Sequence, residues 1–240
     1  FDERGQLHGH TLSDLKIPFL LLGAPALLIM KQPDLGTAML VLFIGATMAL
    51  FAGIRRGTLV LLSIAGGLAA FGGWFLLRDY QKERIRTFLD PERDPLGSGY
   101  HIIQSKIAVG SGGFFGKGFM QGTQSQLSFL PERHTDFAFS VFAEEWGFVG
   151  SLLLLLIYLF IVFWGIYIAR RAADRFGMFL ALGVVAMIFW HIVVNLGMVI
   201  GLLPVVGVPL PLFSYGGTSM VTTMIGTGLL LNVSMRRFMF

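Results

Sequence analysis

A carboxylate at the edge of an apolar segment is the strongest candidate for chemistry in this sequence. Residues 132–135, which include Arg133 and His134, are all polar and lead into Asp136, and a long apolar segment begins at Phe137. A carboxylate at such a boundary is partly desolvated, which makes it more basic and suits it to act as a general base. The same position also suits the N-cap of the following helix. Both interpretations of Asp136 stay open on spacing alone.

Two adjacent acids follow Asp136 inside the apolar segment. Glu144 and Glu145 lie about 12 Å along it if the segment is one continuous helix. Acidic side chains inside a membrane span are costly and require partners or water. They predict either a polar cavity below the site or a structural pair with an arginine or a backbone donor. Small residues at positions 140, 143, 147 and 150 share one face below Asp136, which predicts close packing on another helix or a cleft wall.

Lys117 lies in a glycine-rich stretch, between Gly116 and Gly118. A nucleotide-binding P-loop would require glycine at position 111 and serine or threonine at position 118, but the sequence has Ser111 and Gly118, so this class of site is excluded. A lysine in an outer loop can still bind a diphosphate as a point charge. The alternative is a solvated lysine without a ligand.

Three other places carry polar residues next to apolar segments. Asp34 directly precedes such a segment, where an N-cap is the natural interpretation. Ser214 and Gly216 belong to a tight polar turn whose backbone N–H groups either bind an anion at a helix N-terminus or form a simple re-entrant turn. His191 and Asn195, four residues apart on one helical face, predict a hydrogen-bonded contact between helices.

The composition indicates that membrane helices position these residues. Hydrophobic residues make up 55% of the 240 residues and charged residues 13%, about half the usual charged share. The sequence contains no cysteine, which excludes disulfides and thiolate sites. The net charge of +4 is small and the basic residues are scattered along the sequence, so nucleic-acid binding is not expected.

Six apolar segments predict an all-α polytopic membrane protein with about six transmembrane helices. The expected spans are 17–30, 35–54, 59–77, 137–169, 176–203 and 218–235. A long external loop, residues 78–136, separates spans one to three (17–77) from spans four to six (137–235), and we expect short helices on the membrane surface within it. Residues 1–16 are expected to be a cytoplasmic loop and 236–240 a cytoplasmic end, so an upstream part is expected to be missing.

Basic residues in the short loops predict the orientation. Those expected on the cytoplasmic side are Arg4, Lys16, Arg55, Arg56, Arg170, Arg171, Arg175, Arg236 and Arg237, whereas short loops on the other side carry only Lys31. The long loop 78–136 holds eight basic and seven acidic residues, which nearly balance. We therefore place that loop outside and both ends of the chain in the cytoplasm.

Four motifs, in order, resemble one known family. They are KQPDLGTA at 31–38, GSGGFFGKG at 110–118, FLPERHTDFAFSVFAEEWGFVG at 129–150 and PLPLFSYGGTS at 209–219. Together they resemble the SEDS family of shape, elongation, division and sporulation proteins, and the ERHTDF form is closer to RodA, the elongation branch, than to FtsW, the division branch. The resemblance covers the whole chain. It implies ten spans with both ends cytoplasmic, of which these six would be the last.

The resemblance implies a function at the bacterial cytoplasmic (inner) membrane. The family polymerises lipid II, an undecaprenyl-diphosphate-linked disaccharide-pentapeptide, with a class B penicillin-binding protein that crosslinks the strands during elongation and rod-shape maintenance. Its essential external aspartate falls on Asp136, its QPDLGTA acid on Asp34, its GKG lysine on Lys117 and its SYGG turn on residues 214–217. Trp146 departs from the leucine that relatives often carry.

The implied glycosyl transfer requires a base for the attacking sugar hydroxyl and positive charge for the leaving diphosphate. Asp136 is expected to be the base or the residue that positions the acceptor hydroxyl, and Lys117, Arg133 or a divalent cation (Mg²⁺ or Mn²⁺) would complement the diphosphate. The other residues expected to bind the substrate are His134, Asp34, Glu144, Glu145, Ser214 and Gly216. Two alternatives remain. A lipid II flippase would use a polar cavity around Glu144 and Glu145, and a non-catalytic scaffold for cell-wall synthases would not require Asp136.

Overall fold

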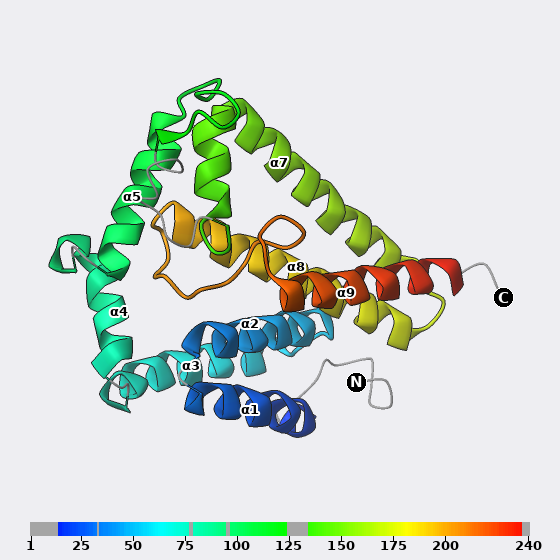
Figure 1. Cartoon of the computed structure of the whole chain (residues 1–240). Helices are drawn as coiled ribbons and strands as arrows, with labels where there is room; N and C mark the ends of the chain where they lie inside the picture. Colours follow the sequence, from blue (N-terminus) through cyan, green and yellow to red (C-terminus); the bar gives the residue numbers. More distant parts are fainter. Residues whose placement is uncertain (1–13, 33, 77–78, 95–96, 124–133, 237–240) are drawn as a thin grey trace.

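The computed structural model describes residues 14–32, 34–76, 79–94, 97–123 and 134–236, and the regular elements in these ranges are helices. They are α1 (Lys16–Lys31), α2 (Leu35–Phe51), α3 (Arg56–Leu76), α4 (Asp79–Leu89), η1 (Pro91–Arg93), α5 (Ser98–Ser111), α7 (Ala138–Arg170), α8 (Arg175–Val199) and α9 (Gly217–Arg236) (Figure 1). The predicted all-α class is confirmed. Arg133 lies outside the described residues.

Helices occupy all six predicted apolar segments. Within the described residues, α7 and α8 are long and apolar enough to cross a membrane, whereas α2 and residues 57–68 of α3 are apolar but shorter. The number of spans therefore stays a prediction. The fifth segment ends at Val199 rather than at position 203, because Gly201 adopts a φ of +73° and the following N–H groups bond back to Gly197 O.

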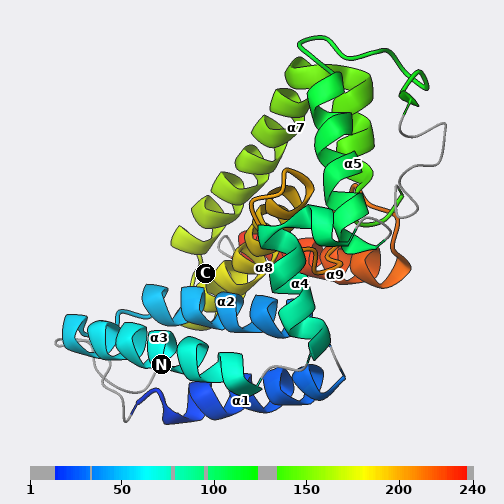
Figure 2. The same cartoon turned by 90° about the vertical axis from the view of Figure 1, so that its left-hand side faces the viewer.

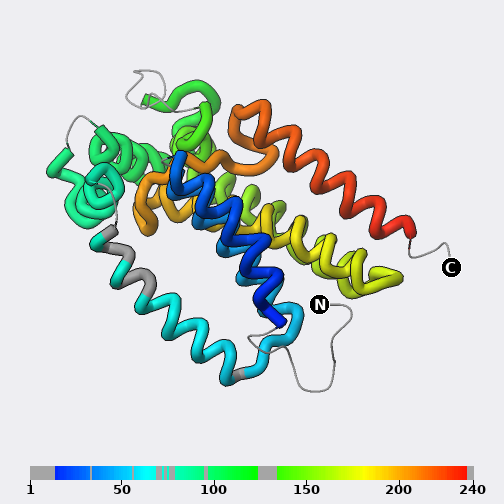
Figure 3. Tube along the Cα trace, turned by 90° about the horizontal axis from the view of Figure 1, so that it is seen from below, coloured from blue at the N-terminus to red at the C-terminus, as the bar shows by residue number. Residues whose placement is uncertain are grey.

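Helix α8 is the centre of the packing. It contacts α2, α7 and α9, and α1 packs on the outer side of α2 (Figure 3). Its buried residues, such as Val185 and Ile188, join Tyr158 of α7 and Leu230 of α9 in the main hydrophobic core. Large apolar side chains such as Phe160 lie exposed on the outer face of α7, as expected of a surface that meets lipid.

The loop between the two groups of helices contains short helices, as predicted. Helices α4 and α5 follow one another at one side of the molecule, joined by η1 (Figure 2). Helix α5 packs on α7. The Ser105 hydroxyl, fully buried on α5, donates a hydrogen bond of 2.7 Å to Val199 O at the end of α8. The position of these helices relative to a membrane surface stays a prediction.

Helix α7 is broken at Gly147, which has φ +65° and ψ −161°. The prediction of one continuous helix over 137–169 is therefore wrong at this point. Residue 147 can leave the helical conformation here because glycine adopts this combination of φ and ψ without strain. We call the break at Gly147 the apex of α7. The first arm, 138–146, runs beside α5, and the second arm, 148–170, leads away from the apex (Figure 1). The small residues at 140, 143, 147 and 150 consequently do not form one continuous stripe. The second arm alone is about 34 Å long, enough to cross a bilayer.

Candidate functional site

The glycine-rich loop after α5 supplies the backbone hydrogen bonds that the break in α7 removes. At a break in a helix, backbone N–H and C=O groups lose the hydrogen-bond partners that lie four residues away in an unbroken helix. When such groups are buried, they need hydrogen-bond partners from another part of the chain. Four bonds of 3.0 to 3.1 Å join the loop to the break: Lys117 N to Glu144 O, Gly118 N to Glu145 O, Phe148 N to Gly113 O and Val149 N to Phe114 O. The loop and the break thus form one structural unit.

Glycines are required where the loop meets the break. A Cβ at Gly116, whose φ is +80°, would collide with Glu145 O. A Cβ at Gly112 would collide with Ala143 O, and one at Gly147 would collide with Gly116 N. The glycine-rich motif is therefore explained by the close approach of two backbones, which agrees with the exclusion of nucleotide binding.

Lys117 and Glu144 form a partly buried ion pair across this unit. The Lys117 Nζ donates to Glu144 Oε1 at 2.7 Å, and the Thr123 hydroxyl lies 3.0 Å from both atoms. The Glu144 side chain is fully buried, while that of Lys117 is 29% exposed. Of the two interpretations of Glu144, the structure therefore shows the structural pair, with a lysine in place of the expected arginine. Lys117 is not a solvated lysine.

Asp136 lies on the turn 134–137, immediately before α7. The N-cap of α7 is Phe137, so Asp136 does not occupy the cap position itself. Two backbone carbonyls of the turn are fixed from outside: His134 O accepts from Tyr215 N, and Asp136 O accepts from the Asn195 side chain, both at 2.8 Å. The Asp136 carboxylate faces Gly207, where a Cβ would lie 3.3 Å from its Oδ2. The turn is therefore anchored both to Asn195 of α8 and to the irregular segment 200–216.

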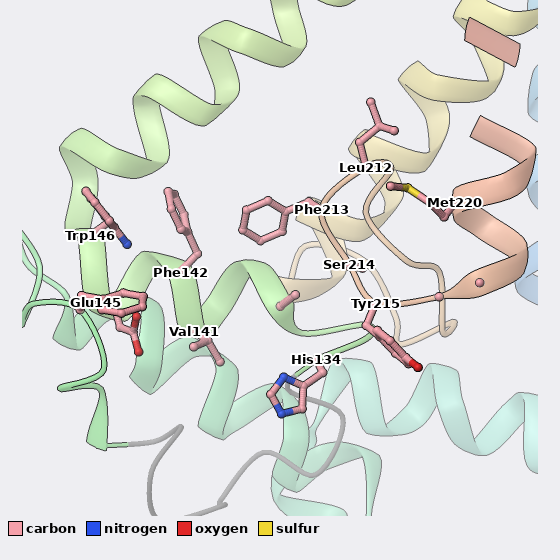
Figure 4. A pocket seen from close by; sticks show the side chains of 14 residues that line it. His134, Val141, Phe142, Glu145, Trp146, Leu212, Phe213, Ser214, Tyr215 and Met220 are labelled. Carbon is pink, nitrogen blue, oxygen red and sulfur yellow. The ribbon is translucent and has the colours of Figure 1, made fainter. Parts of the chain in front are cut away.

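A cavity of about 640 Å³ opens between the first arm of α7, the segment 212–217 and the start of α9 (Figure 4). Four predicted site residues line it together: His134, Glu145, Ser214 and Gly216. Asp136 does not line the cavity, although His134 and Ala138 on either side of it do.

Aromatic rings form much of the cavity wall, and they were missing from the predicted site. The Phe142 ring packs against those of Trp146 and Phe213, with centroids 6.0 and 5.3 Å apart. Phe119 and Tyr215 complete the aromatic lining. The sequence did contain one indication of this wall: residues 142 and 146 are aromatic and four positions apart, which places them on one helical face.

Asp34 lies apart from this cavity and caps α2. Its carboxylate accepts from Thr37 N at 3.0 Å and from the Thr37 hydroxyl at 2.6 Å, which confirms the N-cap interpretation. Thr37 in turn lines a second cavity of about 280 Å³ with His191, Pro209 and residues of α9. Asp34 itself lines neither this second cavity nor the first one.

In the part of the chain that the structure describes, no three His, Cys, Asp or Glu side chains gather into a metal-binding group. The Lys117 ammonium group, which the sequence predicted to bind a diphosphate, is paired with Glu144.

The fold and the site define a helical membrane protein that carries a carboxylate and an aromatic cavity on irregular segments between its apolar helices. More specifically, the chain belongs to the FtsW/RodA/SpoVE family of cell cycle proteins, because the model of that family matches residues 2–238. The family resemblance of the four sequence motifs is thereby confirmed.

Relatives and solved structures match nearly the whole chain. It is 48% identical over 230 residues to peptidoglycan glycosyltransferase MrdB of Escherichia coli (strain K12), covering 95% of this chain and 62% of MrdB. It is 45% identical over 208 residues to stage V sporulation protein E of Bacillus subtilis (strain 168), covering 87% of this chain and 56% of that protein. The chain thus spans about three fifths of these relatives' length.

Two solved structures share the fold. One belongs to a peptidoglycan synthase complex and concerns the structural coordination of polymerization and crosslinking by that complex. Its TM-score is 0.77 at 39% identity, and the match covers 95% of this chain and 63% of that chain. The other is the crystal structure of the rod shape determining protein RodA of Thermus thermophilus, with a TM-score of 0.62 at 32% identity, covering 95% of this chain and 58% of that one.

Proposed function

We propose that this chain belongs to a peptidoglycan glycosyltransferase that polymerises lipid II into glycan strands during cell elongation and rod-shape maintenance. The observation that carries the proposal is the placement of Asp136: its turn is anchored at two carbonyls, and the residues on either side of it line an aromatic cavity. The relatives named peptidoglycan glycosyltransferase support the same reaction class.

In the proposed reaction, Asp136 takes the proton of a sugar hydroxyl while that oxygen attacks the anomeric carbon of a second glycan chain. The carbon–oxygen bond to the lipid diphosphate breaks, and its electron pair leaves with the diphosphate. Lys117 and Arg133 would complement the departing charge, and a divalent cation (Mg²⁺ or Mn²⁺) bound with the substrate would add positive charge there. Because Lys117 holds Glu144, the diphosphate would have to share or replace that bond.

The cavity near Asp136 is the proposed binding place for the substrate. Its aromatic walls suit sugar rings and apolar chain atoms, and His134, Glu145, Ser214 and Gly216 contribute polar groups. Aromatic side chains bury large areas, whereas the few polar groups fix the orientation of a ligand.

The decisive experiment compares the full-length parent with its Asp136→Asn variant, both purified in detergent, in a lipid II polymerisation assay. Asparagine keeps the size of the side chain but cannot accept a proton at neutral pH, so we expect a folded variant that forms no polymer. A flippase without polymerase activity would form no polymer in either preparation, and flipping itself cannot contribute to the readout because detergent removes the membrane. A non-catalytic scaffold would also form no polymer in either preparation, so only a polymerase that uses Asp136 predicts a difference between the two. Polymerisation by a stable Asn variant at the parent's rate would exclude Asp136 as the base.

We further propose a partner and an orientation. A class B penicillin-binding protein is the proposed transpeptidase partner, supported by the similarity to a synthase complex that couples polymerization to crosslinking. The proposed location is the cytoplasmic membrane, with both ends in the cytoplasm. Cysteines placed singly at Arg55, Arg171, Arg236 and Lys117 in this cysteine-free chain would report their side to an impermeant thiol reagent. Labelling at position 55 in intact spheroplasts would contradict the orientation.

A further inference from the structure

One fully buried side chain on α8 connects the Asp136 turn to the rest of the protein. Asn195 donates one hydrogen bond of 2.8 Å to Asp136 O and a second of 2.7 Å to Val208 O, both from Nδ2. An amide nitrogen carries two hydrogens, so these bonds use its whole donor capacity. The sequence spacing predicted a contact between helices here, but both partners are carbonyls of irregular backbone.

The two segments that Asn195 joins have few helical hydrogen bonds of their own. The turn 134–137 precedes α7, and the segment 200–216 crosses from α8 to α9. Irregular backbone keeps a single conformation only where its polar groups find fixed partners. Asn195 supplies such a partner from a helix that is itself the centre of the packing.

The position of the Asp136 carboxylate depends on the same junction. Gly207, with φ +72°, lets the backbone next to Val208 approach that carboxylate, and a Cβ there would lie 3.3 Å from Asp136 Oδ2. Asn195 thus fixes both the backbone that carries the carboxylate and the backbone that the carboxylate faces.

We propose that Asn195 is a positioning residue for Asp136, acting through the backbone carbonyl of Asp136 without touching the substrate. The proposal rests on the proposed function of Asp136 as the base. Within the described residues, the Asn195 Oδ1 is buried and has no hydrogen-bond partner. A buried acceptor without a partner destabilises the fold, and a leucine of similar size would avoid that cost. The advantage of asparagine at this position therefore lies in its two donated bonds.

The test uses the full-length parent in detergent with the variants Asn195→Leu and Asn195→Ala. Leucine keeps the volume and removes both donors, while alanine leaves space in which water can reach the two carbonyls. We expect either folded variant to lower kcat for lipid II polymerisation by about 10- to 100-fold, with KM changed less than about threefold, because misplacement of a catalytic group acts mainly on the chemical step. The sequence has a second asparagine, Asn232, exposed on α9, and Asn232→Leu is the matched control, expected to retain the parent's kcat.

Hydrogen exchange gives a readout that does not require activity. Peptides covering 134–140 and 207–216 should exchange faster in both Asn195 variants, while peptides from α9 should not change. Unchanged kcat in a folded variant would overturn the proposal, and so would a rise in KM at constant kcat. If the unmodified parent formed no polymer, the proposed function would fail. The positioning role of Asn195 would still be tested separately, because unchanged hydrogen exchange over 134–140 in the Asn195 variants would refute it.

Discussion

Removal of the Lys117 charge is the perturbation whose effect follows most directly from the structure. Lys117→Met would remove the lysine charge that lies 2.7 Å from the fully buried Glu144 carboxylate. At 2.7 Å and an effective dielectric constant of about 20, the gross attraction between the two charges is about 6 kcal/mol. Much of this is offset by desolvation, and removing one partner of a buried pair costs about 3–5 kcal/mol. We expect the lower end, about 3 kcal/mol of unfolding free energy, because Lys117 is partly exposed and Thr123 still donates to Glu144.

The converse substitution should cost less. Glu144→Gln leaves a lysine that can turn toward water and an amide oxygen that still accepts from Thr123, so we expect a loss of about 1–2 kcal/mol. The double variant has no uncompensated buried charge and should be more stable than Lys117→Met alone. Thermal unfolding of the full-length parent in detergent measures all three, and Lys31→Met, at an exposed lysine ending α1, is the control. Additive losses, with no coupling free energy, would refute the ion-pair argument.

The same variants separate two functions of Lys117. If Lys117 only stabilises the loop at the break, the double variant should recover polymerisation together with stability. If Lys117 also binds the diphosphate, the double variant should recover stability but stay impaired in polymerisation. Lipid II titrations on the same preparations distinguish these outcomes.

Three further substitutions test other parts of the site. Gly116→Ala should lower the unfolding free energy by about 2–4 kcal/mol, because a Cβ there would collide with Glu145 O. Gly110→Ala is the control and should be nearly neutral, because the space around Gly110 is open. Equal melting temperatures of the two variants would contradict the argument that the two backbones approach closely at Gly116. Asp34→Ala should cost about 1 kcal/mol whereas Asp34→Asn should not, and a stable but inactive Asn variant would assign this carboxylate to chemistry instead of capping. Trp146→Ala should raise KM for lipid II roughly 2- to 10-fold, and an unchanged KM would remove Trp146 from the substrate cavity.

The helices were predictable because their causes are local. Apolar length defines each segment, and a polar residue can mark its start, as Asp34 does by capping α2 through Thr37. The polar residues beside the apolar segments also predicted that Asp136 and Ser214 lie outside the helices, before α7 and α9. Such features depend on residues within a few positions of one another, so a single sequence carries them.

The break in α7 was not predictable from periodicity. Apolar and small residues continue through Gly147 as they would in an unbroken helix, and glycine is common in membrane helices without breaking them. What stabilises the break is a loop about 30 positions earlier, whose backbone groups bond to residues 144–149. The two bonds of Asn195 are equally non-local, since they join it to residues 59 positions before and 13 positions after it.

The first arm of α7 is held at its two ends by different means, which yields a last test. Asn195 and the Tyr215 backbone hold the base, where Asp136 lies, whereas the glycine-rich loop and Lys117 hold the apex. Phe142 and Glu145, which line the cavity, belong to the arm between them. Loosening the apex alone should therefore distort the cavity more than the Asp136 turn and raise KM more than it lowers kcat, while Asn195→Leu should do the opposite. Steady-state kinetics of stable variants at both ends decide this: the same change in KM and kcat from both ends would mean that the arm moves as one body and that its two anchors have no separate functions.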